Sequence, residues 1–303
     1  MKVLEENYIS AVAVARDGAR FVKPVLESLD GALSGMFANY EIIIVDNFSG
    51  DGTAEALRSL EMPATIVTLA RWHGAQDALT AGVELAIGDY ILEIPFVSAD
   101  TDFSRIGEMY GACQNGADFV FLAPAKTALA SRLFYRLLNY CYRGQTALRF
   151  ASSLMTLSSR RGLNKTAESG TRMVNRNVAY MLTGLACASI MSSAAMKSRR
   201  SFRENYGLIT DTLIFHTDLI SGLAFRTALF FFGMCALAIV YSLVLFFVIN
   251  TAPGWASTFI LIAVGFGALF SLLAVICKYL SGLIKLQAPK SYVSGSVEKI
   301  KPK

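Results

Sequence analysis

Aspartate residues recur where short apolar runs of the sequence end. Asp17 follows one run, Asp46 closes a second, and Asp100 and Asp102 follow a third. Carboxylates can accept hydrogen bonds from hydroxyl and amide groups, and they are ligands that divalent cations such as Mg²⁺ prefer. If the runs are neighbouring parallel strands, these side chains lie at one edge of a sheet, where open α/β sheets bind their ligands.

The apolar runs alternate with helical patterns. Ile9–Ala15 is rich in alanine and β-branched residues, and residues 41–45 (EIIIV) form the continuous apolar run that is typical of a strand buried on both faces of a parallel sheet. Further strands are predicted at residues 64–69, 89–94 and 118–122, and helices at residues 21–29, from near Thr53, and at residues 76–86. This alternation predicts an open, mainly parallel α/β sheet with flanking helices.

The 303-residue chain is more apolar than a typical soluble protein. Hydrophobic residues make up 54% and charged residues 17%, whereas soluble domains average roughly 45–50% and about 25%. Five scattered cysteines without a CxxC pair argue against a zinc site and a disulfide framework, and two histidines exclude a histidine-rich metal site. Residues 1–8 lack the apolar core of a signal peptide, so we expect the N-terminal domain in the cytoplasm.

Two uncharged apolar segments lie in the C-terminal part. Residues 227–249 and 255–277 each reach the roughly 20 residues that a helix needs to cross a bilayer. The alternative is a pair of buried core helices, which are rarely so long and uncharged. The linker NTAPGW has no Lys or Arg; Arg226 precedes the first segment, and lysines follow the second, namely Lys278, Lys285, Lys290, Lys299, Lys301 and Lys303. The positive-inside rule predicts a transmembrane hairpin with both flanks cytoplasmic.

Two amphipathic stretches lie between the α/β region and this hairpin. Residues 129–142 place apolar side chains on one side with Arg132, Arg136 and Arg143 nearby, and residues 208–223 place apolar side chains among polar ones. Such a helix can lie in the membrane interface or pack on the sheet. Both alternatives stay open for the first stretch. The interface is favoured for the second, because it runs directly into the first apolar segment.

Two motifs resemble those of a known family. IIIVDNFSGDGTAEAL, at residues 42–57, resembles the VDDGSxDGT signature of family 2 glycosyltransferases with the GT-A fold. RWHGAQDALTAGVELAIGDYIL, at residues 71–92, resembles their RNxGxxxAxxxGxxxAxGDxV run. The layout with interfacial helices and a C-terminal hairpin is similar to the polyprenyl-phosphate branch, which includes the dolichyl-phosphate mannose synthase type.

The resemblance implies a membrane-bound hexosyltransferase that acts in the making of cell-envelope polysaccharide. It would move a sugar from a nucleotide-sugar donor, expected to be a UDP-sugar, to a polyprenyl phosphate at the cytoplasmic face of the inner membrane, with Mg²⁺ or Mn²⁺ as cofactor. The alternative is a catalytically silent relative that binds or scaffolds. No nucleic-acid partner is expected, and self-association stays open. The implied order is a GT-A-like domain at residues 1–205, an interfacial helix at 206–226, the hairpin at 227–285 and a basic tail at 286–303.

The resemblance also implies a set of nucleotide-binding residues. Asp46 matches the first acid of the signature and would contact the nucleotide, while Asn47 stands where a second acid is usual. Asp17, in ARDGARF, would face the ribose or base, and Asp89 would touch the nucleotide pocket. Arg71 would face the diphosphate, with a solvated surface charge as an equal alternative.

Other positions depart from the family pattern or have a plainer explanation. Asp51 matches the third acid, but a helix cap explains it better. The family's DxD pair falls on Pro95 and Val97 if no gap is allowed. A register with about three inserted residues is preferred instead; it leaves Asp100 as the metal ligand, and Asp100 and Asp102 as the candidate catalytic residues. Turn or cap roles are their alternative.

The acceptor side carries a second departure. Where the branch usually has GDFRL, this chain has SGTRMVNR, with Gly170 at the position of the acid. Arg172 and Arg176 remain, and the resemblance implies that both contact the phosphate of the lipid acceptor.

Overall fold

The computed structural model describes residues 4–144, 146, 148–168, 173–193, 209, 211–212, 217, 219–249, 255–286 and 292–300. The chain divides into two units, which are described separately. Unit 1 consists of Met1–Ile209 together with Pro289–Lys303, and unit 2 of Thr210–Ala288.

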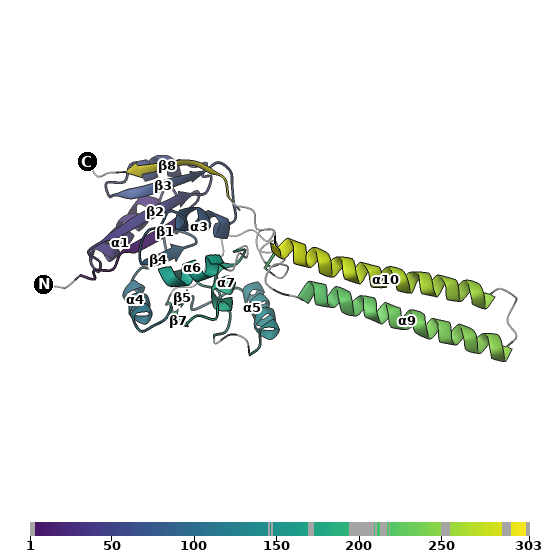
Figure 1. The fold of residues 1–303 in the computed structure, drawn as a ribbon. Coiled ribbons are helices and arrows are strands. Elements are labelled where there is room, and N and C mark those ends of the chain that lie inside the picture. Colours follow the sequence, from purple (N-terminus) through teal and green to yellow (C-terminus); the bar gives the residue numbers. More distant parts are fainter. Residues whose placement is uncertain are drawn as a thin grey trace. The chain divides into compact units, whose positions relative to one another are not determined.

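An eight-stranded sheet with the strand order β7-β5-β6-β4-β1-β2-β3-β8 forms the centre of unit 1 (Figure 1). Four neighbouring pairs are parallel and three, β4–β6, β5–β6 and β3–β8, are antiparallel. The predicted mainly parallel α/β sheet is therefore confirmed. The strands are β1 (Ile9–Ala15), β2 (Tyr40–Asp46), β3 (Ala64–Leu69), β4 (Tyr90–Ile94), β5 (Phe119–Ala123), β6 (Met155–Ser159), β7 (Cys187–Met191) and β8 (Ser294–Ile300).

Helices flank this sheet. They are α1 (Val22–Ser34), α2 (Thr53–Arg58), α3 (Ala75–Val83), α4 (Ile106–Gln114), α5 (Leu129–Cys141), α6 (Arg160–Glu168) and α7 (Arg176–Leu182). Every residue of β1 is buried, and its odd-numbered side chains share one core with α1 and α4. Val12 lies on the other face, where α3 approaches so closely that a Cβ on Gly82 would stand 2.4 Å from Val12 Cγ1. The glycine in the AxxxG part of the motif thus lets α3 lie against β1 and β2.

The C-terminal strand β8 differs from the expected basic tail. It pairs antiparallel with β3, with Ala64 opposite Ile300 and Val67 opposite Val297. Arg58 on α2 donates two hydrogen bonds to Glu298, at 3.0 and 3.1 Å. Residues that follow the apolar hairpin in sequence therefore complete the edge of the sheet in unit 1.

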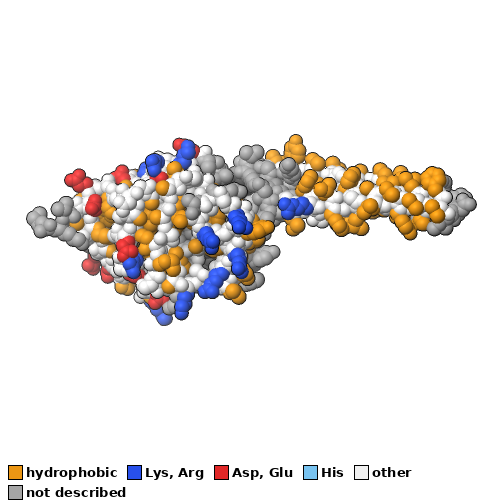
Figure 2. Space-filling model, turned by 90° about the horizontal axis from the view of Figure 1, so that it is seen from below, with side chains coloured by type: hydrophobic (Ala, Val, Ile, Leu, Met, Phe, Trp, Pro, Cys, Tyr) orange, Lys and Arg blue, Asp and Glu red, His pale blue; other side chains and the backbone are white. Residues whose placement is uncertain are grey.

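Unit 2 contains two long helices, α9 (Leu219–Ile249) and α10 (Trp255–Leu286). Each contains a span long and apolar enough to cross a membrane, Gly222–Leu245 and Ser257–Cys277, and only 11% and 17% of an 18-residue apolar stretch in each is buried within the chain. That low burial does not fit the core-helix alternative. The two helices lie side by side, with the rings of Phe231 and Phe270 stacked at 4.9 Å, and hydrophobic side chains cover their visible face (Figure 2). Most of the predicted amphipathic stretch at residues 208–223 lies outside the described residues.

Candidate functional site

The carboxyl ends of β1, β2 and β3 bring several of the predicted residues together. In the parallel register, Asp46 at the end of β2 lies beside Ala15 of β1 and Thr68 of β3. Asp17 follows β1 by two residues, so it reaches the same edge as Asp46. This edge is the position at which open α/β sheets bind ligands.

The loops that follow β1 and β2 are bonded to each other through polar side chains. The Asp17 carboxylate accepts the N–H of Gly50 at 3.0 Å, and the Asp17 N–H donates to Ser49 Oγ at 3.1 Å. Asp17 adopts a left-handed backbone conformation with φ of 47°, which is uncommon for a residue with a side chain but better tolerated by aspartate. These bonds hold the exposed Asp17 carboxyl group against the loop that contains Asp46.

Asp51 completes this contact as a turn residue just before α2, whose N-cap is Gly52. Its carboxylate accepts hydrogen bonds from the N–H of Ala19 and of Thr53, each at 3.1 Å, and from the Thr53 hydroxyl. Partial burial acts to raise the pKa of Asp51, but these hydrogen bonds outweigh it and lower the pKa overall. The contacts of Asp51 therefore serve the turn before α2, while the N-cap itself is Gly52 and has no side-chain hydrogen bond.

Asp46 is the buried member of the acidic group. Its side chain is 1% exposed, and Oδ1 accepts hydrogen bonds from the N–H and the hydroxyl of Ser49. Burial raises the pKa of Asp46, and the nearby carboxylates of Asp51 and Asp17 add to the rise, against the effect of Ser49. A carboxyl group in this environment favours any ligand that brings hydrogen-bond donors or positive charge to it.

Asn47 is committed to the protein itself. Its amide Nδ2 donates to the carbonyl of His73 at 2.7 Å, while its Oδ1 accepts the N–H of His73 at 3.0 Å. An aspartate could accept but could not donate in this pair. The missing second acid of the signature is thus explained by a clamp between the β2 loop and the loop after β3.

That clamped loop carries an exposed arginine and an exposed aromatic ring. Arg71 and Trp72 are both exposed, and the guanidinium of Arg16 lies 5.5 Å from the centre of the Trp72 ring. Phe48, on the β2 loop, is 57% exposed and has a positive φ of 60°. Sequence reasoning missed these two rings, although Phe48 and Trp72 both lie within the two motifs described above. An edge with carboxylates, guanidinium groups and ring faces can recognise a polar, anionic, planar ligand.

The segment after β4 gives a mixed result for the predicted metal ligands. Val97 is buried, and its N–H donates to the carbonyl of Val14 at 2.9 Å, so the gap-free register places an apolar anchor there. Asp100 lies exposed in the turn that follows. Both oxygens of Asp102 accept hydrogen bonds from Ser104, from its N–H and its hydroxyl, each at 2.9 Å, just before α4. Asp102 thus acts as a turn residue.

The donor set allows only a sparse cation site. Among the residues that the structure describes, no group of three or more His, Cys, Asp or Glu side chains is arranged to hold a metal ion. A Mg²⁺-type ion on a diphosphate needs only one or two protein carboxylates, because phosphate oxygens and waters fill the rest of its shell. Asp100 fits that requirement as a single protein ligand.

Arg176 is placed differently from the expectation that it contacts a lipid phosphate. Its side chain is 3% exposed, and its guanidinium donates to both oxygens of Glu93, at 2.7 and 3.1 Å. Tyr180 also donates to Glu93, and Thr80 accepts from Arg176 at 3.1 Å. The charge is therefore neutralised inside the fold, where it joins α7 to β4 and α3. Arg172 lies outside the described residues.

Asp89 lies at the amino ends of the strands, whereas Asp46 lies at their carboxyl ends. It precedes β4, its carboxylate accepts the N–H of Tyr8 at 2.9 Å, and its carbonyl accepts the N–H of Arg160 at 2.8 Å. The amino ends of β1 and β4 are thus tied together by Asp89. The structure does not bring it to the group formed by Asp17 and Asp46.

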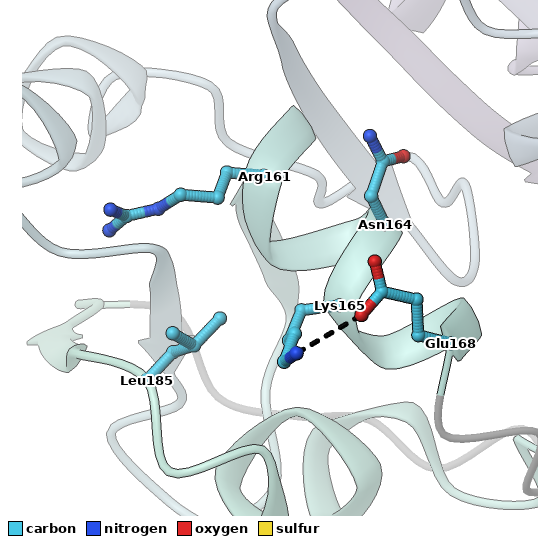
Figure 3. A pocket seen from close by; sticks show the side chains of 5 residues that line it. All are labelled: Arg161, Asn164, Lys165, Glu168 and Leu185. Carbon is cyan, nitrogen blue, oxygen red and sulfur yellow. Dashed lines mark hydrogen bonds and ion pairs between the residues drawn. The ribbon is translucent and has the colours of Figure 1, made fainter.

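Two cavities also lie away from that group. One, of about 490 Å³, is lined by Arg161, Asn164, Lys165, Glu168 and Leu185; Arg161 extends away from the Lys165–Glu168 ion pair (Figure 3). The other, of about 340 Å³, is lined in part by Asp89 and Arg160. In the first, Arg161 is paired with Asp118 at 2.7 Å and Lys165 with Glu168 at 3.0 Å, so its charged groups are already occupied.

Comparisons with known proteins agree with this architecture. Residues 14–179 match the family model described as Glycosyl transferase family 2. Comparison with curated protein sequences finds no match. Mannosyl-3-phosphoglycerate synthase from Rubrobacter xylanophilus is similar in structure, with a TM-score of 0.52 and 18% identity over 68% of this chain and 72% of that chain.

A second similar structure contains ligands. Glucosyl-3-phosphoglycerate synthase from Mycobacterium tuberculosis, solved with Mn²⁺, uridine diphosphate and phosphoglyceric acid, has a TM-score of 0.54 and 16% identity over 69% of this chain and 76% of that chain. At these identities, the likeness establishes the fold of the α/β domain.

Proposed function

Because the chain belongs to glycosyl transferase family 2, we propose that it transfers a sugar from a UDP-sugar to a polyprenyl phosphate at the cytoplasmic face of a membrane. The family supplies the transferase class and the nucleotide-sugar donor. One observation carries the acceptor: two helices long enough to cross a membrane lie between β7 and β8 of a single sheet. A domain joined to such a hairpin at both ends works at the membrane surface, where a phosphate on a long apolar chain is presented.

The donor nucleotide would bind at the carboxyl ends of β1 and β2. Asp46 and Asp17 offer carboxylate acceptors for ribose hydroxyls or base amino groups. Arg71 would pair with the diphosphate, since guanidinium groups match phosphate geometry. The ring of Trp72 offers a face for the base. Support comes from the M. tuberculosis glucosyl-3-phosphoglycerate synthase, whose fold is similar and which was solved with uridine diphosphate.

Asp100 would hold a divalent cation, Mg²⁺ or Mn²⁺, which when bound offsets the charge that develops on the leaving diphosphate. Asp100 is exposed in the turn that follows β4, in which the Ser98 N–H donates to Thr101 Oγ1 at 2.9 Å. Asp102 serves the turn through Ser104 and is not proposed as a second ligand.

The reaction itself is a substitution at the anomeric carbon of the sugar. An oxygen of the lipid phosphate forms a bond to that carbon, the bond from the carbon to the donor's β-phosphate oxygen breaks, and the nucleoside diphosphate leaves. A phosphate monoester is already ionised near neutral pH. The chain therefore needs to position this nucleophile more than to deprotonate it.

The hairpin topology supports the same side for both flanks. Since β7 and β8 belong to one sheet, the segments before α9 and after α10 lie on one side of any membrane that the two helices cross. Lysines after the second helix favour the cytoplasmic side. A reporter fused after Lys303 should be active only in the cytoplasm, and activity on the outer side would contradict the proposal.

Transfer can be tested on the full chain in lipid nanodiscs that contain polyprenyl phosphate. Radiolabelled UDP-sugars, with GDP-sugars alongside, are added with Mn²⁺, and the label in the lipid fraction is measured. We expect label to move to the lipid with at least one UDP-sugar and not when polyprenol without phosphate replaces the acceptor. Donor binding without transfer of any sugar would contradict the proposal.

A catalytically silent binding subunit is the second candidate. The observation in its favour is the sparse cation site, in which Val97 is an apolar anchor and Asp102 is bonded to Ser104. Calorimetric titration with UDP, with and without Mn²⁺, separates the two. An affinity that does not change with Mn²⁺ would favour the silent subunit.

A further inference from the structure

Helix α5 exposes a stripe of large apolar side chains on unit 1. Leu129, Leu133, Leu137 and Tyr140 are 71%, 58%, 40% and 74% exposed. At 3.6 residues per turn, their spacing places all four on one side of the helix. A contiguous row of this kind is unusual on a soluble surface and marks a site of contact with another apolar phase.

The buried face of α5 is a different face from the one that carries this stripe. Phe134 and Leu138 are the buried residues of α5 and face the interior. Asn139 fixes the helix to the following segment, because it donates to the Phe150 carbonyl at 3.0 Å and accepts the Phe150 N–H at 2.7 Å. The helix is thus anchored through one face, while the leucine stripe stays outside.

A row of arginines borders the stripe on its other side. Arg132 and Arg136 lie one helical turn apart on α5, next to the leucines around the helix, and Arg143 follows just after the helix ends at Cys141. All three are exposed. The order around the helix is therefore a buried face, an apolar stripe and a basic row. Long arginine side chains can lie along an apolar surface while their charged ends reach polar headgroups.

The surrounding sequence adds only positive charge. No Asp or Glu occurs between Asp118 and Glu168, a stretch that contains Lys126, Arg132, Arg136, Arg143, Arg149, Arg160, Arg161 and Lys165. Within the described part of the chain, no carboxylate forms an ion pair with an arginine of α5. In Figure 2, which views the molecule from the side where α5 lies, Lys and Arg side chains gather at this end of unit 1 beside hydrophobic ones.

We propose that the outer face of α5 docks on the anionic lipid surface of the membrane, with the leucine stripe inserted below the headgroups and the arginine row at their phosphates. The apolar stripe and the basic row together match the two layers of a lipid interface. The proposal rests on the membrane location proposed above and not on the transfer reaction. It assigns to α5 the role of holding the soluble unit against the bilayer.

Tryptophan reporters in the full chain test this docking. The chain is placed in nanodiscs made with anionic lipids that carry bromine on their acyl chains, which quench tryptophan on contact. Leu133→Trp reports on the α5 stripe, and Ile87→Trp, at an exposed apolar position between α3 and β4, is the matched control. Leu261→Trp in α10 reports on membrane insertion of the hairpin. The unchanged protein supplies the background of Trp72 and Trp255.

The expected result is strong quenching of Leu133→Trp and Leu261→Trp, and none of Ile87→Trp. Reversing one arginine of the row, as in Arg136→Glu, should lower the ratio of docked to undocked helix about fivefold or more, because each basic residue near an anionic surface contributes a factor of about this size. Replacing the anionic lipids with zwitterionic lipids should also reduce the quenching of Leu133→Trp. Tyr140→Trp, a conservative exchange on the same stripe, repeats the test should Leu133→Trp disturb folding.

Other results would overturn the proposal. If Leu261→Trp is quenched while Leu133→Trp and Tyr140→Trp behave like Ile87→Trp, the membrane location stands and the docking of α5 fails. If Leu261→Trp is not quenched either, the membrane location itself fails. A third result would assign the stripe to a second copy of the chain: the Leu133→Trp fluorescence changes only when a nanodisc holds two copies, and it is the same with brominated and unbrominated lipid.

Discussion

His73 and Val293, which are 220 residues apart, are joined by a hydrogen bond from the Val293 N–H to the imidazole Nε2 of His73 at 3.1 Å. Because Nε2 accepts, the proton of the neutral ring lies on Nδ1, which donates to the Arg71 carbonyl at 2.6 Å. The imidazole thus connects the loop of the candidate donor site to the segment that enters β8.

His73→Phe should therefore loosen this loop. The substitution leaves the Val293 N–H and the Arg71 carbonyl without their partner, which should lower stability by about 1–3 kcal/mol and weaken UDP binding. Thermal unfolding and calorimetry measure the two effects. Tyr292→Phe is the control, since it removes a hydroxyl bonded to Glu84 and leaves the imidazole contact in place. Equal UDP affinity in the two variants would contradict the link.

Arg176 should matter for folding before it matters for any acceptor. Arg176→Ala leaves the buried Glu93 charge without its partner, which should cost about 3–5 kcal/mol of stability. The double variant Glu93→Leu/Arg176→Met removes both charges and should lose less than Arg176→Ala alone. Unfolding of the purified full chain measures this. An Arg176→Ala protein as stable as the parent would refute the structural role.

Asp46→Asn should separate stability from binding. Burial raises the pKa of Asp46 in the folded chain, so the folded state holds the proton more tightly than the unfolded state. The associated stability is present below the unfolded pKa and is lost as the pH rises through the raised folded pKa. Above the folded-state pKa, the ionised carboxylate lowers the stability by roughly 1.4 kcal/mol for each unit by which folding raises the pKa of Asp46.

The asparagine variant lacks this cost. It should unfold at a higher temperature than the parent near neutral pH, the difference should vanish as the pH falls below the pKa of Asp46, and UDP should bind more weakly. Thermal unfolding across a pH series and calorimetry at neutral pH provide the measurements. A stability difference that is constant with pH would show that ionisation of Asp46 is not its cause.

Asn47→Asp restores the acid of the family signature, yet it should impair the protein. The new carboxylate cannot donate to the His73 carbonyl and adds charge beside Asp46, so stability should fall by about 1–3 kcal/mol. UDP affinity should also fall. Asn47→Ala, which loses the clamp without adding charge, identifies the electrostatic part by comparison. Tighter UDP binding by Asn47→Asp would mean that the clamp is dispensable.

Asp100 and Asp102 are predicted to differ. Asp100→Asn should remove most of the Mn²⁺-dependent part of UDP affinity, because a single carboxylate is the proposed protein ligand. Asp102→Asn should leave that part nearly unchanged, since its oxygens are bonded to Ser104. Calorimetry with UDP in the presence and absence of Mn²⁺ compares them. Similar losses in both variants would place the cation elsewhere.

The parts of the fold that were predictable from sequence are those with local signals. β1 and β2 were predicted because buried parallel strands are continuous apolar runs, and the start of α2 because turn residues precede Thr53. β8 was missed because SGSVEKI is largely polar and its side chains are mostly exposed. An edge strand that pairs through its backbone leaves little trace in hydrophobic periodicity.

The residues of the candidate site were predictable only where their place at the end of a strand is enough to locate them. Asp17 and Asp46 follow adjacent strands, so topology brings them together. The roles of Asn47 and Arg176 depend on partners distant in sequence, the backbone of His73 and the carboxylate of Glu93. A motif comparison reads the residue type at such a position but not the partner that occupies it.

The place of β8 also orders the biosynthesis of the protein. A ribosome synthesises β3 long before β8, and α9 and α10 are made between them. Until the hairpin has been synthesised and β8 has emerged, the β3 edge of the sheet presents unpaired backbone groups, the kind of edge at which nascent chains aggregate. Completion of unit 1 is therefore coupled in time to synthesis of the hairpin, and a chain that stalls in the hairpin exposes an unfinished sheet to the quality-control machinery of the cell.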